Sequence, residues 1–289
     1  MPSAFKLILK PISEGTLPGN QGPAVHGLFL KLINETDAPL ADMLHKDSEQ
    51  HPYTLSPPYL SKGKPGDSVR HFSTETEVAM RLCVLDDNIT QSIYNALLNA
   101  MKTPRVKLCG FDYTLSGLLI ENALTFEQII KGAQDSGSIN RFRIDFKTPA
   151  AFKHDGKSML FPQVDYILGG LERRWNQYAE PIDKTHIREA VSSVYPTQYE
   201  LKTSILEHTR KNNKGNNDVP GEDENDIKTG GARDKYYKSG FTGFCIYETA
   251  QTTKEVNNTI FKLLIFAGFT GIGHKTTMGM GQVKIEVKA

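Results

Sequence analysis

The chain has 289 residues, of which 38% are hydrophobic and 23% charged, and its formal net charge is +1. This composition is typical of a globular protein with room for two domains, and the near-neutral charge argues against a strongly basic nucleic-acid binder. No stretch approaches the roughly 20 apolar residues of a membrane span, and Cys83, Cys109 and Cys245 form no CxxC pair. We therefore expect a cytoplasmic protein without a membrane segment, a disulfide framework, a bound metal or another cofactor.

The first half of the chain predicts the element order β-α-β-β-α-β. Residues 4–10 have the pattern of a strand, and from Pro23 onward apolar residues recur every three or four positions, as in an amphipathic helix. Pro23 suits the first helical position because its missing N–H needs no partner there. Strands are expected within 67–85 and 105–121, with a helix at about 88–101 between them. This order is the split βαβ, or ferredoxin-like, arrangement.

The second half predicts the same order again. Residues 139–147 alternate apolar and polar side chains like a half-buried strand. The later elements are expected at 163–178 (helix), 194–206 and 236–248 (strands), 252–267 (helix) and 282–288 (strand). Within the first of these helices, Trp175 continues the apolar stripe, so core packing is favoured for it over base stacking.

We therefore predict an α+β protein made of two tandem ferredoxin-like domains, residues 1–125 and 135–289, joined by a segment that includes a short helix. Between the middle strands of the second domain, residues from about 208 to 234 are rich in Asn, Gly and charge and almost lack apolar side chains. Such a segment cannot bury enough surface to offset the entropy of ordering it, so a flexible insertion is expected there.

The stretch GFTGIGHKTTMGMGQV, residues 268–283, is expected to connect a helix to a strand. That direction and its spacing exclude the dinucleotide fingerprint GxGxxG and the Walker sequence GxxxxGK[ST]. Glycines without a Cβ let phosphates approach backbone N–H groups, and Lys275, Thr276 and Thr277 add a charge and hydroxyls. The pattern thus favours a phosphate-binding loop, and the alternative is a turn that packs closely against a neighbouring sheet.

GIGHKTTMGMG follows the GhGxxxxxGxG signature, with h apolar, of the RAMP proteins of CRISPR systems. The chain resembles in particular their pre-crRNA-processing endoribonucleases, the Cas-six family, in PAVHGLFLKLI, in FKTPAAFKHDGKSMLFPQVDYILGGLERRWN and in SGFTGFCIYE. The resemblance implies two ferredoxin-like domains, binding of CRISPR repeat RNA and one metal-independent cut per repeat. Precursor crRNA is the expected partner, with a CRISPR effector complex and a second copy of the chain as further candidates.

Metal-free RNA cleavage needs a base for the 2′-OH proton, a proton donor for the 5′-oxygen and positive charge near the phosphorane. His26 is the candidate base or acid, because it lies near the start of the first helix, about 110° from the centre of the apolar stripe. The helix N-terminus disfavours imidazolium and so lowers the pKa of His26, while Gly27 leaves room for a nucleotide. From the residues alone, a single histidine at a helix edge is more often a structural or solvent-facing residue. It is the resemblance that implies a catalytic histidine on this helix.

The partners of His26 depart from the pattern of the resembled family, in which some members pair the histidine with an upstream tyrosine and a lysine on the same helix. No tyrosine precedes Tyr53, so the tyrosine role is expected to be empty. Lys31 is the candidate lysine, although it projects about 140° around the helix from His26, and the alternative is a solvated lysine. His45 and His51 lie in a polar, proline-bounded connection and are expected at the surface.

The residues expected to contact RNA are Gly271, Gly273, His274, Lys275, Thr276, Thr277, Gly279, Gly281, Lys202, Arg141 and Arg143. Two alternative functions stay open. The first is a non-cleaving RAMP-type RNA-binding subunit of an effector complex. The second is an unrelated RNA-recognition module that uses exposed sheet aromatics, although Thr242 in KSGFTGFCIY breaks the expected spacing.

Overall fold

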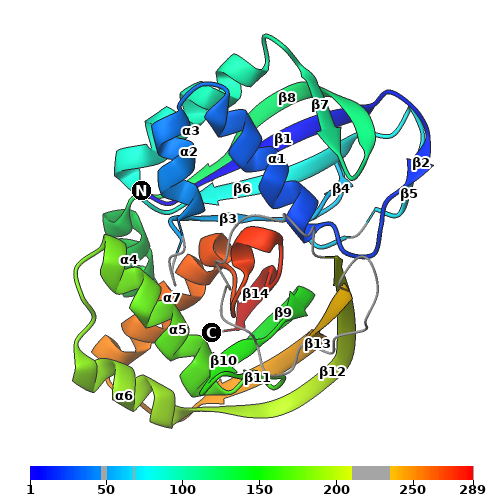
Figure 1. The fold of residues 1–289 in the computed structure, drawn as a ribbon. Coiled ribbons are helices and arrows are strands. Elements are labelled where there is room, and N and C mark those ends of the chain that lie inside the picture. The colour runs from blue at the N-terminus through cyan, green and yellow to red at the C-terminus, as the bar shows by residue number, and fades with distance from the viewer. Residues whose placement is uncertain (47–50, 68, 210–234, 289) are drawn as a thin grey trace.

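The computed structural model describes residues 1–46, 51–67, 69–209 and 235–288 (Figure 1). The insertion expected at about 208–234 lies almost wholly outside these residues and stays a prediction. None of the described helices is both long enough and apolar enough to cross a membrane.

The first sheet is antiparallel and has the strand order β3-β6-β1-β8-β7, with β4 also pairing β6. Its strands are β1 (Ser3–Pro11), β3 (Tyr53–Leu55), β4 (Tyr59–Leu60), β6 (Val78–Val84), β7 (Arg105–Leu108) and β8 (Phe111–Ala123). Helices α1 (Gly22–Asn34), α2 (Ala38–His45) and α3 (Asp87–Ala100) lie on one side of it (Figure 1). Alternate β1 side chains, Phe5, Leu7 and Leu9, are buried beneath these helices.

The strands expected within 67–85 are β5 (His71–Phe72) and β6. A turn separates them, in which the Ser73 amide donates to Thr76 Oγ1 and the Thr76 amide donates to the Ser73 carbonyl oxygen, both at 3.0 Å. β5 pairs with the short β2 (Gly15–Thr16) outside the main sheet. The second strand of the ferredoxin-like order is instead β3, which the sequence analysis did not predict, as it did not predict α2.

The second sheet is antiparallel and has the order β12-β13-β9-β14. Its strands are β9 (Arg141–Ala150), β12 (Val194–Thr209), β13 (Lys235–Thr249) and β14 (Val283–Lys288), and a separate hairpin joins β10 (Phe152–His154) to β11 (Lys157–Met159). The helices of this half are α4 (Phe126–Asp135), α5 (Val164–Tyr178), α6 (Lys184–Ser193), α7 (Lys254–Thr270) and the 3-10 turn η1 (Thr276–Met278). Trp175 of α5 is fully buried in the core, as expected.

In the first sheet, β7 is an addition at the edge. Apart from it, both sheets have the same order: the second strand lies beside the third, the third beside the first and the first beside the fourth. This is the ferredoxin-like order, so the prediction of two tandem ferredoxin-like domains is confirmed. The element between α5 and the second strand, α6, was not predicted; it begins where Asp183 accepts a hydrogen bond from the Thr185 amide at 2.6 Å.

The C-terminal end of α7 joins the two domains, since it reaches from the second domain to β3 and β6 of the first sheet (Figure 1). Arg81 donates to the carbonyl oxygen of Gly268 at 2.8 Å, and Thr54 donates to that of Phe269 at 2.9 Å. Beyond the glycine-rich loop, Gln282 donates to the carbonyl oxygen of Leu55 at 3.1 Å. These contacts hold the glycine-rich loop against β3 and the start of α1.

Candidate active site and RNA-binding surface

His26 is the fifth residue of α1, and its ring is held by a residue from β3. Its Nε2 lies 2.8 Å from the hydroxyl of Tyr53, whose side chain is fully buried and packs on Phe29 with ring centroids 4.7 Å apart. Among the described residues, Nδ1 of His26 has no hydrogen-bond partner. Tyr53 therefore fixes the imidazole through one nitrogen and leaves the other for a substrate.

The expectation that the tyrosine role is empty is wrong. It considered only residues upstream of His26, whereas Tyr53 follows it by 27 positions and reaches it because β3 pairs with the edge of β6. Nothing in the spacing of the sequence marks this pair, since the segment between the two residues has no single periodicity. The one available signal was the short apolar run that contains Tyr53.

The pKa of His26 is lowered to about 4, chiefly by burial and also by the neighbouring imidazoles of His51 and His45. The direction agrees with the expectation from the helix N-terminus, but burial is the largest cause. His26 is therefore neutral near pH 7 and can accept a proton.

Two other histidines gather at the same place. His45 is the last residue of α2, and its ring centroid lies 6.5 Å from that of His26 with an interplanar angle of 24°. His51 is half-buried and packs against the ring of Tyr53, with centroids 5.7 Å apart. His45 is exposed, as expected, yet α2 brings it beside His26, a contact that the sequence did not indicate.

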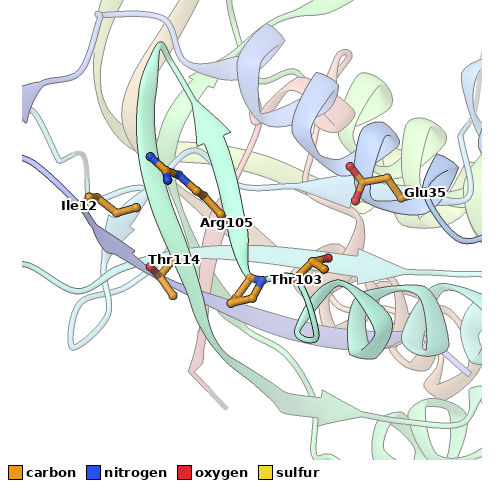
Figure 2. A pocket seen from close by; sticks show the side chains of 6 residues that line it. Ile12, Glu35, Thr103, Arg105 and Thr114 are labelled. Atoms are coloured by element: carbon orange, nitrogen blue, oxygen red, sulfur yellow. The ribbon is translucent and has the colours of Figure 1, made fainter.

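Lys31 is directed away from this cluster. Its side chain is 64% exposed, and Nζ lies 3.7 Å from Glu35 Oε1, one turn toward the C-terminal end of α1. That end of the helix also borders a shallow pocket of about 410 Å³, which is lined by Glu35, the residue that follows α1, and by side chains of β7, β8 and neighbouring loops (Figure 2). None of the predicted site residues lines this pocket, so the two ends of α1 differ in chemistry.

The glycines of the loop mostly serve close packing. The amides of Gly271, Gly279 and Gly281 donate to the carbonyl oxygens of Ala267, Thr276 and Pro149, at 2.9, 3.3 and 3.0 Å. A Cβ added to Gly273 would lie 2.6 Å from the carbonyl oxygen of Ala151, and one added to Gly281 would overlap that of Ile272. The amides of Gly271, Gly279 and Gly281 therefore do not form the predicted phosphate cradle, and the alternative of a tightly packed turn describes them.

The loop nevertheless lies beside the helix that carries His26. A Cβ added to Gly22, the first residue of α1, would overlap the carbonyl oxygen of Met278, and one added to Gly279 would lie 2.8 Å from Pro57 Cδ. The structure thus places the glycine-rich loop and the start of α1 in direct contact. This proximity was a requirement of the sequence-based hypothesis.

Several side chains of the loop already make hydrogen bonds within the protein or are buried in it. His274 Nδ1 lies 3.1 Å from the carbonyl oxygen of Ala151, and Thr276 is buried and accepts a hydrogen bond from Arg174 Nη2 at 2.9 Å. Thr277 is also buried, and Lys275 precedes η1 with a left-handed backbone, φ 57°. Burial therefore withdraws the Thr276 hydroxyl from the surface where a phosphate was predicted to bind.

Arg174 of α5 supports the loop. Besides Thr276, it donates through Nη1 to the carbonyl oxygen of Thr270 at 2.7 Å. Burial lowers its pKa to about 10, so it keeps its charge near pH 7. No carboxylate of the described residues lies within ion-pair distance of it. Directly behind the glycine-rich loop there is therefore a positive charge that no acid of the described residues pairs with.

A groove of about 900 Å³ runs between the two domains, bordered by the first turn of α1, by Pro57 and Pro58 and by residues 278–280. Arg70 of the first domain and Lys147 of the second also line it. Within the described ranges neither cation has a carboxylate close enough for an ion pair. Neither residue belongs to a motif, so the sequence indicates no role for either.

Comparison with known proteins identifies the family to which this arrangement belongs. Residues 144–283 match the model of the CRISPR-associated endoribonuclease Cas6, and residues 1–125 match that of the CRISPR Cas6 N-terminal domain. The chain belongs to the Cas6 family. The resemblance found in the sequence is thereby confirmed.

A curated CRISPR-associated endoribonuclease Cas6 from Streptococcus thermophilus is 25% identical over 148 residues, which are 50% of each chain. The matched part thus spans about half of that relative. Among solved structures, a Cas6 product complex superposes with a TM-score of 0.70 at 21% identity and covers 99% of this chain and 100% of the other. A Cas6 substrate mimic complex gives 0.67 at 18% identity, with 99% of each chain covered. These superpositions show a shared Cas6 fold.

The remaining RNA-contact candidates of this Cas6 protein lie on the open face of the second sheet. Arg141 pairs with Glu248 at 3.9 Å, and Arg143 pairs with Asp145 at 2.8 Å. Lys202 is exposed on β12 opposite Thr242. The two arginines are therefore already charge-compensated in the protein alone.

Residues 239–249 of β13 form no exposed aromatic platform of the kind that the RNA-recognition alternative needs, although Tyr195 and Tyr199 of the neighbouring β12 are exposed. Phe241 and Tyr247 are buried in the core, on the face of the sheet opposite Arg143. Phe244 lies beneath the guanidinium of Arg143, whose carbon is 3.8 Å from the ring centroid.

In the described residues, no group of three or more His, Cys, Asp or Glu side chains is arranged to hold a metal ion.

Proposed function

We propose that this protein cleaves CRISPR repeat RNA in precursor crRNA by metal-independent attack of a ribose 2′-OH on the adjacent phosphate. The observation that carries the proposal is His26, a neutral imidazole fixed through Nε2 by a buried tyrosine and located beside the glycine-rich loop. Membership of the Cas6 endoribonuclease family supports the same conclusion.

In the proposed reaction, Nδ1 of His26 accepts the proton of the 2′-OH as the 2′-oxygen attacks phosphorus. The bond between phosphorus and the 5′-oxygen breaks, and the products carry a 2′,3′-cyclic phosphate and a 5′-OH. Donation of Nε2–H to the oxygen of Tyr53 keeps Nδ1 deprotonated and free before the reaction, and the same bond persists in the imidazolium. Tyr53 thus positions the base.

The groove between the domains is the proposed path of the RNA next to the scissile phosphate. Arg70 and Lys147 provide cations from opposite domains, and Arg174 adds positive charge behind the loop. Such charges attract a phosphate backbone without selecting its sequence. An effector complex and a homodimer stay predictions, as does the contact of Lys202, Arg141 and Arg143 with RNA.

The test uses labelled repeat RNA in EDTA, with a matched RNA that carries a single 2′-deoxy substitution at the cut. The wild-type protein should cleave the first RNA to a cyclic phosphate and leave the second intact. His26→Ala should cleave about 100-fold to 10,000-fold more slowly while binding the RNA with unchanged affinity. His186→Ala, on α6, is the matched control.

Loss of cleavage in EDTA, or cleavage of the deoxy RNA, would contradict the metal-independent mechanism. Tight binding by the wild-type protein without any cleavage would favour the alternative of a non-catalytic RAMP-type subunit. Full activity of His26→Ala would show that another residue is the base.

A further inference from the structure

Segment 271–275 of the glycine-rich loop is held at both of its ends by one side chain. Arg174 of α5 donates through Nη1 to the carbonyl oxygen of Thr270 at 2.7 Å and through Nη2 to the hydroxyl oxygen of Thr276 at 2.9 Å. We propose that Arg174 is a positioning residue that sets segment 271–275 to receive one phosphate of the RNA backbone and whose charge attracts that phosphate from behind the loop. This inference rests on the proposed function and deepens it.

The two hydrogen bonds of Arg174 need the shape of a guanidinium. Thr270 is the last residue of α7 and Thr276 is the first residue of η1, so the bonds join the two sides of the segment. A guanidinium presents its donors in a rigid planar fork, whereas the ammonium of lysine is a point charge on a flexible stem. Arg174 therefore fixes the separation of the two ends of the segment, which a lysine cannot do.

The charge of Arg174 has no counter-ion in the part of the chain that the structure describes. Tyr178, one turn along α5, interacts with it, but burial raises the pKa of Tyr178 to about 12, so its hydroxyl is neutral near pH 7. A desolvated charge without a partner is costly to the fold. An anion bound on the outer side of the loop would offset this cost, because charges interact more strongly through protein than through water.

The outer side of the segment lies where the RNA backbone is proposed to pass. Gly273, His274 and Lys275 are half-buried and so reach the surface, and Lys275 brings a second cation. The same loop contacts the start of α1 at Gly22, which precedes His26 by about one helical turn. A phosphodiester that lies across the segment is thus close to the phosphate that reacts.

Arg173, the neighbour of Arg174 on α5, is a matched contrast. Its side chain is exposed, and it makes no hydrogen bond or ion pair with any described residue. A hydrated charge at the surface is screened by water and salt. The two arginines therefore carry the same charge in different surroundings, and only Arg174 is bonded to the loop.

The test measures, by fluorescence anisotropy, the affinity for repeat RNA with the 2′-deoxy substitution at the cut, so that cleavage does not interfere. In a series of such RNAs, an uncharged methylphosphonate replaces one phosphate at a time. In the wild-type protein, neutralising one particular phosphate that flanks the cut should weaken binding about tenfold or more.

Arg174→Gln should bind the unmodified RNA about tenfold more weakly, and neutralising the same phosphate should then cost less than about threefold more. At every other phosphate it should show the wild-type penalty. Arg173→Gln, which loses the same charge, should keep the wild-type pattern throughout. Arg174→Lys keeps the charge without the fork, so its penalty at the particular phosphate should be smaller than that of the wild type but not abolished.

Wild-type affinity of Arg174→Gln, or weaker binding with an unchanged penalty at every phosphate, would overturn the assignment, since the latter is the mark of a purely structural role. The absence of such a phosphate in the wild type would also overturn it. If Arg174→Gln does not fold, Arg174→Lys decides, because a penalty of wild-type size or none at all contradicts the proposal. A wild-type protein that binds repeat RNA but does not cleave it would contradict only the proposed function.

Discussion

The two halves of the chain follow the same strand order, β3-β6-β1-β8 in the first sheet and β12-β13-β9-β14 in the second. They contribute different kinds of chemical group to the candidate site. The first half supplies side chains that can move or hold protons, His26, Tyr53 and His45. The second half supplies a rigid backbone loop whose glycines pack against other main-chain atoms. A shared topology therefore does not imply a shared role, because the chemistry lies in the segments that connect the strands.

The greatest expected effect of a single substitution on stability concerns the glycine-rich loop. Gly281 has a φ of +67°, and a Cβ added to it would overlap the carbonyl oxygen of Ile272. Gly281→Ala should therefore lower the free energy of unfolding by more than about 3 kcal/mol, as measured by chemical denaturation. Gly110→Ala is the control, since its φ is +91° with no atom within 4 Å of the added Cβ, and it should cost about 1–2 kcal/mol. Equal losses would show that close backbone contact does not hold the loop.

Tyr53→Phe tests the contribution of the first half. It removes the hydroxyl that lies 2.8 Å from His26 Nε2 and should slow cleavage about tenfold, with unchanged affinity for RNA. Single-turnover kinetics at saturating protein measures the effect. Tyr113→Phe is matched, because the buried Tyr113 hydroxyl has no hydrogen-bond partner among the described residues. If both variants cleave at the wild-type rate, Tyr53 does not position the base.

Replacing one cationic side chain in each half of the chain tests whether both halves bind the RNA. The double variant Arg70→Ala and Lys147→Ala should reduce the salt dependence of RNA affinity, with a change of about 0.7 in slope for each phosphate that the protein no longer neutralises. Fluorescence anisotropy across a salt series measures the slope. Arg141→Ala, whose guanidinium already pairs with Glu248, should change it less. A larger change in slope for Arg141→Ala than for the double variant would place the RNA on the open face of the second sheet.

The smallest expected effect on stability comes from a glycine that makes no close contact, in contrast to Gly281. Gly27 is exposed on α1, and a Cβ added to it would meet nothing within 4 Å. Gly27→Ala should therefore stabilise the protein by about 0.5–1 kcal/mol, opposite in sign to Gly281→Ala, as thermal unfolding can show. If RNA passes over this position, Gly27→Leu should also weaken RNA binding, and unchanged binding would contradict that path.

Regular periodicity was sufficient for most of the fold. The helix expected at 163–178 is observed at Val164–Tyr178, and the strand expected at 194–206 is observed at Val194–Thr209. The elements that were missed, β3 and α2 among them, are short. Three residues of strand or eight of helix span too few turns or alternations to stand out from a proline-rich connection.

The candidate site was predictable only in part. His26 followed from its place on an amphipathic helix together with the family resemblance, and the glycine signature located the loop. Tyr53 was marked only by a short apolar run, and Arg174 and Arg70 belong to no motif. The hydrogen bonds of Tyr53 to His26 and of Arg174 to Thr276 join residues that are distant in the sequence. Lys31 was suggested by the family pattern of a lysine on the same helix, although its helix spacing already placed it on another flank than His26. In the structure it pairs with Glu35 instead.

The sequence by itself determined the two repeated element orders, the family and the candidate catalytic histidine, since periodicity and motif spacing are local properties of a chain. Only the tertiary structure decided which groups surround that histidine and whether the loop amides are free. Those outcomes depend on how two domains pack, and packing joins residues that no regular spacing connects.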